Sequence, residues 1–396
     1  MSSYQPIVQW IENLPQWLGA WMKERLRDED DYSRWLEDGR DFIDEEKIWR
    51  LIKENSDPTR SQVRVIIDKA LSSKECLEPE ETAKLLNIKD EQLWKEVYEA
   101  AGEVKKEVYD NRIVTFAPLY CSDYCVNNCL YCAFRRENQV VRKRLSIEEV
   151  EKEARALAAA GHKRLITSYG EHPLSDAGYI AETLKAIYRV KVKTRSGWGE
   201  IRRVNINAAP MTVEELKMLK QIGIGTFQVF QETYHHETYR AVHPADTIKG
   251  SYHWRLYCMH RALEAGVDDV GIGVLLGLYD WRFEVMGLLF HSRELEEKFG
   301  VGPHTISFPR LRPALNTPFV QRAEYKVSDS DFKKFIAVVR LSVPYTGMIL
   351  TAREPEHVRR EVLPLGITQT DFGSRIGIGS YTSGNSDQLP DRQQFL

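Results

Sequence analysis

Residues 113–132 read IVTFAPLYCSDYCVNNCLYC, in which an apolar, partly β-branched run is followed directly by four of the chain's six cysteines. The run Ile113–Leu119 predicts a buried β-strand, since β-branched and aromatic residues suit a pleated surface. After it, Cys125, Cys129 and Cys132 stand in the spacing C-x3-C-x2-C. Three thiolates on one short loop repel one another, so we expect them to share a bound cation. The sequence therefore predicts a strand that ends in a metal site.

Two kinds of metal site fit this cysteine loop, an iron–sulfur cluster and a structural zinc ion. Three thiolates hold three irons of a cubic cluster and leave the fourth iron open to a ligand, whereas a closed ferredoxin cluster takes four. Structural zinc usually combines two pairs of cysteine or histidine ligands, and the sequence has no second pair near the motif. The open cluster is therefore favoured. We expect Cys121 to be a spare thiol, because a fourth ligand would close the site.

Length and composition limit the classes of function. The 396 residues suffice for one barrel of about 250 residues with an extension, or for two domains. With a formal net charge of -3, the chain lacks the basic excess typical of proteins that bind nucleic acid or membrane surfaces. It has no run of 18 apolar residues and no basic start followed by an apolar core. We expect a cytoplasmic protein with reduced cysteines that binds small molecules, not nucleic acid or membranes.

The N-terminal part, residues 1–110, lacks convincing strand patterns. In its last predicted helix, Leu93, Val97, Ala100 and Val104 recur at helical spacing, so one face of that helix is buried. We expect a helical extension that wraps on the following domain. Its predicted helices are residues 6–23, 45–54, 59–72, 79–86 and 90–108.

Residues 111–375 alternate between short β-rich runs and helical segments. Ser146 and Thr212 each stand three residues before a glutamate, which is the pattern of a capping box at a helix start. Strand–helix alternation repeated eight times predicts an α/β fold of the (βα)8 TIM-barrel type, with residues 376–396 as a C-terminal tail. A doubly wound open sheet is the alternative. The predicted strands are residues 113–119, 164–169, 201–206, 225–230, 269–276, 304–308, 347–350 and 366–369.

In such a barrel, chemistry gathers at the C-terminal ends of the strands. The cysteine loop follows the first strand, Glu171 follows the second, Asn205 and Asn207 end the third, and Glu232 follows the fourth. Each has an ordinary structural explanation, such as a carboxylate accepting from a loop amide or a hydrogen-bonded polar filler of the barrel. Their common placement instead predicts one polar site at this rim.

Arg310 follows the sixth predicted strand. An arginine at this position cannot be buried without an anion, and its planar fork suits a carboxylate. We expect Arg310 to seat the carboxylate of a substrate. The alternative is a salt bridge to Glu171, Glu232 or Glu354 on the same rim.

Four histidines lie between the fourth and fifth predicted strands. They are His235, His236, His253 and His260. They do not form a closely spaced signature of two histidines and a carboxylate, so we expect them to be solvated or to cap helices.

The cysteine spacing, with Tyr131 directly before the last cysteine, resembles the signature of the radical S-adenosylmethionine (SAM) superfamily. Further segments, together covering about residues 40–396, resemble its aromatic amino-acid lyases. Those segments are residues 117–120, 142–145, 230–234, 269–273, 307–313 and 351–354. The resemblance implies a radical SAM barrel that binds a [4Fe-4S] cluster and SAM. It assigns the cluster to Cys125, Cys129 and Cys132, and the SAM site to Tyr131, Glu171, Asn205, Asn207 and Glu232.

The resemblance also implies a reaction. A 5′-deoxyadenosyl radical from SAM would start cleavage of the Cα–Cβ bond of L-tyrosine to p-cresol and 2-iminoacetate. Arg310 would hold the tyrosine carboxylate, with Tyr120 and Ser307 as further substrate contacts. A reduced donor of the flavodoxin or ferredoxin type would supply electrons, and a protein of the thiamine or hydrogenase pathway would be a further partner.

Two families share this resemblance, the 2-iminoacetate synthase of thiamine synthesis and the tyrosine lyase that matures [FeFe]-hydrogenase by making CO and cyanide. The maturase carries extra cysteines in a C-terminal domain, whereas this sequence has none after Cys258. Trp254–Leu256 resembles the thiamine enzyme, although much of the remaining sequence resembles the maturase. A tryptophan-cleaving relative and a non-catalytic iron–sulfur scaffold remain as alternatives.

Overall fold

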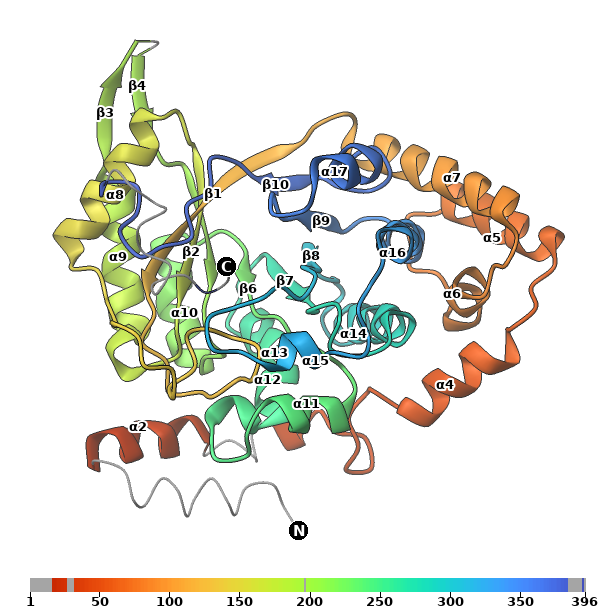
Figure 1. The fold of residues 1–396 in the computed structure, drawn as a ribbon, viewed down its shortest axis with the longest axis horizontal. Helices are drawn as coiled ribbons and strands as arrows, with labels where there is room; N and C mark the ends of the chain where they lie inside the picture. The colour runs from red at the N-terminus through yellow and green to blue at the C-terminus, as the bar shows by residue number, and fades with distance from the viewer. Residues whose placement is uncertain (1–15, 27–31, 196, 384–393, 395–396) are drawn as a thin grey trace.

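A computed structural model describes residues 16–26, 32–195, 197–383 and 394. Its centre is a closed barrel of eight parallel strands in the order β1-β10-β9-β8-β7-β6-β5-β2 (Figure 1). The predicted barrel is therefore confirmed, and the open sheet is wrong, because β1 pairs with β2 on one side and β10 on the other. The strands are β1 (Val114–Ser122), β2 (Arg164–Tyr169), β5 (Arg203–Asn207), β6 (Phe227–Gln228), β7 (Val270–Gly273), β8 (Thr305–Ser307), β9 (Gly347–Leu350) and β10 (Gln369–Asp371).

Helices outside the barrel connect the parallel strands, as crossover connections require. Ser146 and Thr212 form the predicted capping boxes at the starts of α8 and α10. The latter helix ends at Gly223, whose φ of 87° is left-handed and favours glycine. The barrel helices are α8 (Ile147–Ala159), α9 (Ala177–Arg189), α10 (Val213–Ile222), α13 (Cys258–Glu264), α14 (Trp281–Phe299), α16 (Asp329–Ser342) and α17 (Glu356–Val362).

Strand boundaries agree with the sequence where the run is apolar and bounded, as at 164–169 and 347–350. The predicted strand 225–230 shortens to β6, whose two residues are buried. A two-stranded antiparallel sheet was not predicted. It consists of β3 (Lys191–Thr194) and β4 (Gly197–Glu200), which are largely exposed and lack an apolar face.

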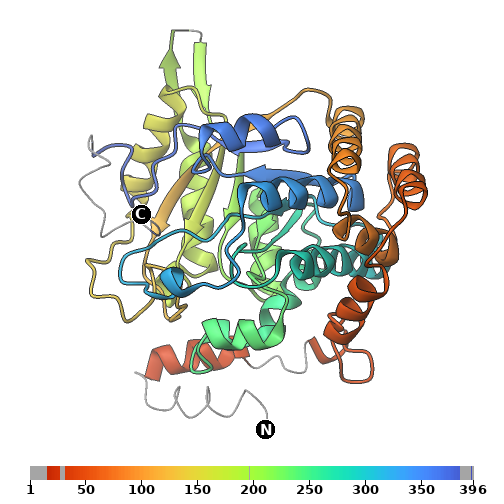
Figure 2. The same ribbon diagram turned by 45° about the vertical axis from the view of Figure 1, so that its right-hand side comes forward.

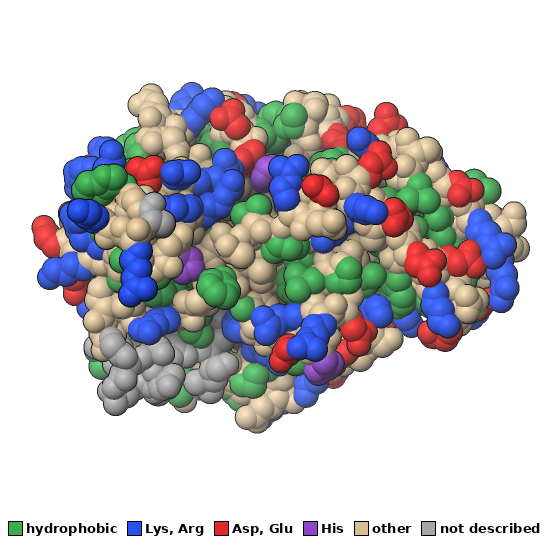
Figure 3. All heavy atoms as spheres, turned by 90° about the horizontal axis from the view of Figure 1, so that it is seen from above, with side chains coloured by type: hydrophobic (Ala, Val, Ile, Leu, Met, Phe, Trp, Pro, Cys, Tyr) green, Lys and Arg blue, Asp and Glu red, His purple; other side chains and the backbone are tan. Residues whose placement is uncertain are grey.

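The β3–β4 hairpin projects from the end of the barrel where the strands begin, because it connects the end of α9 to the start of β5 (Figure 1). Figure 3 views the molecule from this side and shows lysine and arginine side chains gathered there. Lys191, Lys193 and Arg195 are exposed on the hairpin, as is Trp198. The cysteine loop lies at the opposite end of the barrel.

The N-terminal extension runs along one flank of the barrel (Figures 1 and 2). Helix α7 buries Leu93, Val97, Ala100 and Val104, the face predicted from their spacing, and packs against α16. The first predicted helix, residues 6–23, lies partly outside the described residues. The helices of this part are α2 (Gln16–Leu26), α4 (Glu45–Glu54), α5 (Arg60–Ser72), α6 (Pro79–Leu86) and α7 (Glu91–Tyr109).

Helix α2 crosses the barrel end that carries the cysteine loop. Met22 packs there with Val126 of that loop and with Ile248 and Trp254. Arg25 makes a two-pronged ion pair with Glu215, at 2.9 and 3.0 Å. Within the described parts of the chain, no helix is both long and apolar enough to cross a membrane.

Candidate active site

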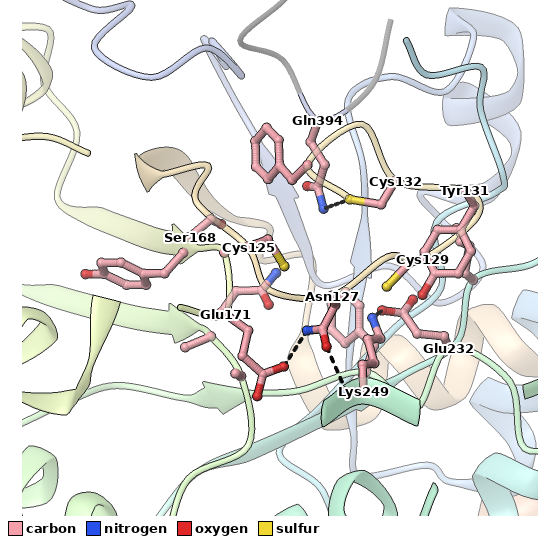
Figure 4. Close-up of a pocket in the computed structure, with 18 of the residues that line it drawn as sticks. Cys125, Asn127, Cys129, Tyr131, Cys132, Ser168, Glu171, Glu232, Lys249 and Gln394 are labelled. Atoms are coloured by element: carbon pink, nitrogen blue, oxygen red, sulfur yellow. Dashed lines mark hydrogen bonds and ion pairs between the residues drawn. The ribbon is translucent and has the colours of Figure 1, made fainter. Parts of the chain in front are cut away.

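A cavity opens where the strands end, and the cysteine loop forms one of its walls (Figure 4). Cys125, Cys129 and Cys132 all line it, and their sulfur atoms turn toward one space. Cys121 is fully buried elsewhere, with its Sγ 3.7 Å from the Leu119 carbonyl oxygen. This placement agrees with a three-ligand site.

Burial dominates the chemistry of these three thiols. It raises the pKa of Cys125 to about 11 and that of Cys129 to about 12, and it raises the pKa of Cys132 as well. The thiolate of Cys132 further raises the pKa of both Cys125 and Cys129, because like charges at this range repel. Three such groups ionise together only if a cation compensates them, which fits the donor set of an open cubic iron–sulfur cluster.

The loop after β2 approaches the cysteine loop very closely. A Cβ atom added to Gly170 would lie 2.2 Å from the Tyr124 carbonyl oxygen, so only glycine fits there. Next to it, Glu171 lines the cavity and is only 6% exposed. Its Oε2 accepts from Asn127 Nδ2 at 2.6 Å, and burial raises its pKa. Its Oε1 has no hydrogen-bond partner among the described residues, which suits a cationic group of a ligand.

Glu232 stands at the opposite wall in an unusual backbone conformation, with φ of 72°. A non-glycine residue in this region is strained, and such strain concentrates at functional sites. Its carboxylate pairs with Lys249 Nζ at 2.7 Å and lies 3.6 Å from Arg255 Nη2. All three side chains line the cavity, so this wall carries one negative and two positive charges.

Tyr131 also lines the cavity, with 3% of its surface exposed. Its hydroxyl lies 2.7 Å from His243 Nε2, and Lys249 Nζ lies 5.5 Å from its ring centroid. One contact at its hydroxyl and one over its ring therefore hold Tyr131 in the cavity wall.

A second cavity continues from the first into the barrel lumen. Tyr120 and Asn207 line both cavities, whereas Ser307 lines only the lumen. Asn205 lines neither, because its Oδ1 accepts from the Thr226 amide at 3.0 Å and ties two strands together. Gln394 reaches the cavity mouth, where its Oε1 accepts from the Tyr120 hydroxyl at 3.4 Å.

Arg310 does not lie on the wall of either cavity, contrary to the expectation that it seats a substrate. Its guanidinium donates to both Glu354 carboxylate oxygens and to Asp329 Oδ1, the latter at 2.7 Å. It also lies over the Phe332 ring, 4.7 Å from the centroid. The structure thus places Arg310 in the salt bridge to Glu354 that the sequence offered as the alternative.

The arginine that lines both cavities is Arg353, in the loop after β9. Its Nε donates to Thr351 Oγ1 at 3.2 Å. Burial raises the pKa of the nearby Tyr120 hydroxyl, and the positive charge of Arg353 opposes that rise. From the sequence, Arg353 belongs to the segment 351–354 that resembles the lyases but receives no role, because a linear sequence does not say which residue of a loop turns inward. Lys249 and Arg255 were missed for a different reason, because they lie far along the chain from any predicted strand end.

Comparison with known proteins identifies the family. Residues 119–287 match the model of the radical SAM superfamily, and residues 307–395 match the biotin and thiamin synthesis associated domain. The chain is 30% identical to 2-iminoacetate synthase of Escherichia coli over 297 residues, covering 74% of each protein.

Two solved structures of HydG, a maturase of the [FeFe]-hydrogenase, resemble the chain more strongly. One is 49% identical with a TM-score of 0.84, covering 90% of this chain and 75% of that one. The other, from Carboxydothermus hydrogenoformans, is 43% identical with a TM-score of 0.78, covering 89% and 78%. Radical SAM proteins use a [4Fe-4S] cluster and SAM. The chain belongs to the radical SAM superfamily, in the tyrosine lyase family that contains 2-iminoacetate synthase and HydG.

Proposed function

We propose that this protein cleaves the Cα–Cβ bond of L-tyrosine to p-cresol and 2-iminoacetate. One observation carries the proposal: a cavity walled by Cys125, Cys129 and Cys132 continues into a lumen cavity, and Arg353 lies on the wall of both. The first space suits the cofactors, and the second suits an amino acid whose carboxylate meets the guanidinium.

Three cysteines would hold the [4Fe-4S] cluster, and the other cavity residues would hold SAM. The free Oε1 of Glu171 would accept from the SAM ammonium group, and Glu232 would accept from its ribose hydroxyls. Tyr131 would lie against the adenine, and Asn207 would complete the polar wall. When bound, the cofactors supply a radical that abstracts hydrogen from the substrate amino group.

Arg353 replaces Arg310 as the residue proposed to bind the substrate carboxylate. Tyr120, which lines the same space, would contact the backbone end of the substrate. In this proposal the protein's contribution is to hold the Cα–Cβ bond in one orientation and to exclude water. Arg310 then acts indirectly, by fixing the loop of Glu354 next to Arg353.

The residues that line the lumen cavity suit a substrate whose side chain is a phenol ring. Phe116, Ile166 and Ile349 form a small apolar cluster on its wall. Gln228 also lines it, is 1% exposed, and has an Oε1 atom without a partner among the described residues. Its Nε2 already donates to Thr305 Oγ1 at 3.3 Å. An apolar wall with one free buried acceptor suits an aromatic ring that ends in a hydroxyl group.

The second candidate is maturase chemistry, in which tyrosine yields CO and cyanide. The 49% identity to HydG favours it. Against it, the resemblance places an iron-site histidine of the maturase at about residues 254–256, and in this chain that segment instead brings the positive charge of Arg255 to the cavity wall. A guanidinium cannot bind iron because it has no free acceptor.

The test is an anaerobic assay of the reconstituted protein with dithionite, SAM and L-tyrosine, with products separated by liquid chromatography. We expect 5′-deoxyadenosine, p-cresol and glyoxylate, the hydrolysis product of 2-iminoacetate, without cyanide. Cyanide would favour the maturase. Deoxyadenosine without p-cresol would contradict tyrosine as the substrate. If neither product forms, the remaining interpretation is a non-catalytic iron–sulfur scaffold.

A specificity variant sharpens this test. Gln228→Leu removes the free acceptor, so it should lower turnover of tyrosine by about tenfold or more relative to the native protein, the loss expected for an unpaired hydroxyl. Deoxyadenosine formation without substrate should not change. If Gln228→Leu leaves tyrosine turnover unchanged, the phenol does not lie in the lumen.

A further inference from the structure

A second group of potential metal ligands lies outside the cavity. Asp41, His236 and His253 each bring one ligand atom to within 4.8 Å of the others. Asp41 Oδ2 lies 2.9 Å from His236 Nε2 and 2.7 Å from His253 Nε2. The three come from separate parts of the fold, the loop before α4, the start of α11 (His236–Val242), and α12 (Tyr252–Leu256).

A carboxylate also contacts the other nitrogen of one imidazole. His236 Nδ1 lies 2.6 Å from Glu45 Oε1, on the first turn of α4. Histidines that bind a metal commonly donate their second ring N–H to a carboxylate, which fixes the tautomer and makes the ligating nitrogen more basic. Glu45 can hold Nδ1–H of His236 in this way, which leaves Nε2, the nitrogen that faces Asp41, to give up its proton when an ion binds.

The group opens onto a surface groove, so an ion has a path to it. Asp41 is nearly buried at 5% side-chain exposure, whereas His236 and His253 are 23% and 32% exposed. The groove is lined by seven acidic residues against three lysines and arginines, so its field attracts cations. The acidic residues are Glu37, Asp38, Asp41, Asp44, Glu45, Glu46 and Glu294.

We propose that Asp41, His236 and His253 bind one divalent first-row transition-metal ion of the zinc or ferrous type. Two imidazoles with one carboxylate suit these ions, whereas Mg²⁺ and Ca²⁺ prefer oxygen ligands throughout. Zinc with bonds of about 2.0–2.1 Å sets tetrahedral ligand atoms about 3.3 Å apart, so each of the two Asp41–histidine distances needs to open by only about half an ångström. The remaining positions of the ion face the groove.

Of the four histidines considered from the sequence, His235 does cap α11, as expected, by accepting from the Thr238 amide. His236 and His253 differ from His235, because the carboxylate that joins them stands 195 and 212 residues earlier in the chain. That distance is why the sequence showed no metal signature.

A bound ion would connect the N-terminal extension to the cavity wall. Helix α11 starts four residues after Glu232, and His253 stands two residues before Arg255. Both Glu232 and Arg255 line the cavity. The ion would therefore fasten the loop of Asp41 to the segment that positions this wall, independently of which reaction the cavity performs.

The test is Co²⁺ titration of the chelator-treated full-length protein, with Cys125, Cys129 and Cys132 replaced by alanine so that the cluster thiols cannot bind the probe. We expect one Co²⁺ per chain, seen by its visible d–d absorption and displaced by Zn²⁺. His253→Gln and Asp41→Asn should weaken Co²⁺ binding by more than a hundredfold, and Glu45→Gln by about 10–100-fold.

His357→Gln is the matched control, because His357 also pairs with an aspartate, Asp329, but lies away from the groove. It should leave Co²⁺ binding unchanged. Thermal melts without metal separate a loss of metal binding from a loss of folding. His253→Gln retains a donor for Asp41, so its melting temperature should match that of the parent. The proposal is overturned if the parent binds no Co²⁺, or if folded His253→Gln binds it as tightly as the parent.

Discussion

The wall of the active-site cavity can be compared with the shell just outside it, which consists of Arg310, Arg312 and Glu354. Both regions use charged and polar side chains, but they differ in where those side chains find partners. On the wall, Glu171 Oε1 has no hydrogen-bond partner among the described residues, and three thiols lie together with raised pKa values. In the shell, Glu354 is held by Arg310 and Arg312. In this pair of regions, the free Glu171 oxygen and the clustered thiols indicate ligands, whereas Arg310, Arg312 and Glu354 satisfy one another and indicate structure. Changes on the wall should therefore remove activity, and changes in the shell should remove stability.

The largest effect is expected for the cysteine loop. Cys129→Ser should reduce deoxyadenosine formation to below detection, because loss of one thiolate prevents a stable open cluster. Iron content and the visible absorption of the reconstituted protein provide the measurement. Cys121→Ser is the control and should retain the cluster, since Cys121 lies outside the cavity. Loss of the cluster in Cys121→Ser would instead make Cys121 a ligand.

The next largest effect is expected for Arg353. Arg353→Ala should lower tyrosine turnover by about a hundredfold, because the substrate loses its orientation. Deoxyadenosine formation without tyrosine should persist, and the melting temperature should change little. Steady-state product analysis provides the measurement. Turnover equal to that of the native protein would remove Arg353 from the substrate site and return Arg310 to consideration.

Arg310 sharpens the comparison, because it lies in the shell. Arg310→Met leaves Glu354 buried with Arg312 as its remaining partner, so the free energy of unfolding should fall by about 3 kcal/mol. Urea denaturation measures this loss. Lys333→Met, which removes an ion pair on the helix surface, is the control and should cost no more than about 1 kcal/mol. A stable Arg310→Met protein without tyrosine turnover would contradict the structural role.

The last prediction concerns pH, and its effect is gradual because it is spread over several pH units. Glu284 is fully buried between Thr233 and the Tyr234 amide, and burial raises its pKa to about 8. The folded state therefore keeps a proton that the unfolded state loses above about pH 4.5, so stability falls as the pH rises from 4.5 to 8. The slope is up to about 1.4 kcal/mol per pH unit. Glu284→Gln should flatten it, as measured by urea melts at several pH values; an unchanged slope would assign it to another group.

The sequence predicted those parts of the fold that depend on local pattern. The apolar run 164–169 and the capping boxes at Ser146 and Thr212 appear as expected. The three cysteines of the motif also meet at one cavity, because a short loop keeps them together. These features depend on neighbours in sequence, which a linear pattern records.

Features that depend on distant parts of the chain were not predictable in the same way. Arg310 and Arg353 both stand in loops at the active rim, and only the packed structure shows that Arg353 turns inward while Arg310 pairs with Glu354. Asp41 contacts His236 although 195 residues separate them in the sequence. The β3–β4 hairpin escaped prediction because its exposed strands have no apolar face to produce an alternating pattern.

The way β1 is shared between two neighbours has a consequence for the order of assembly. Its second half pairs with β2, which follows soon in the chain, whereas Val114 to Phe116 pair with β10. Because pairings between distant parts of the chain form late, β1, which carries the cysteine loop, should be paired with β2 alone until the chain beyond Gln369 has been synthesised. Pulsed hydrogen exchange during refolding should show protection of the Val114 amide, which donates to the Thr368 carbonyl, after that of the β2 amides. Iron and sulfide would then have their easiest access to the loop while the ring is still open, during synthesis and before closure.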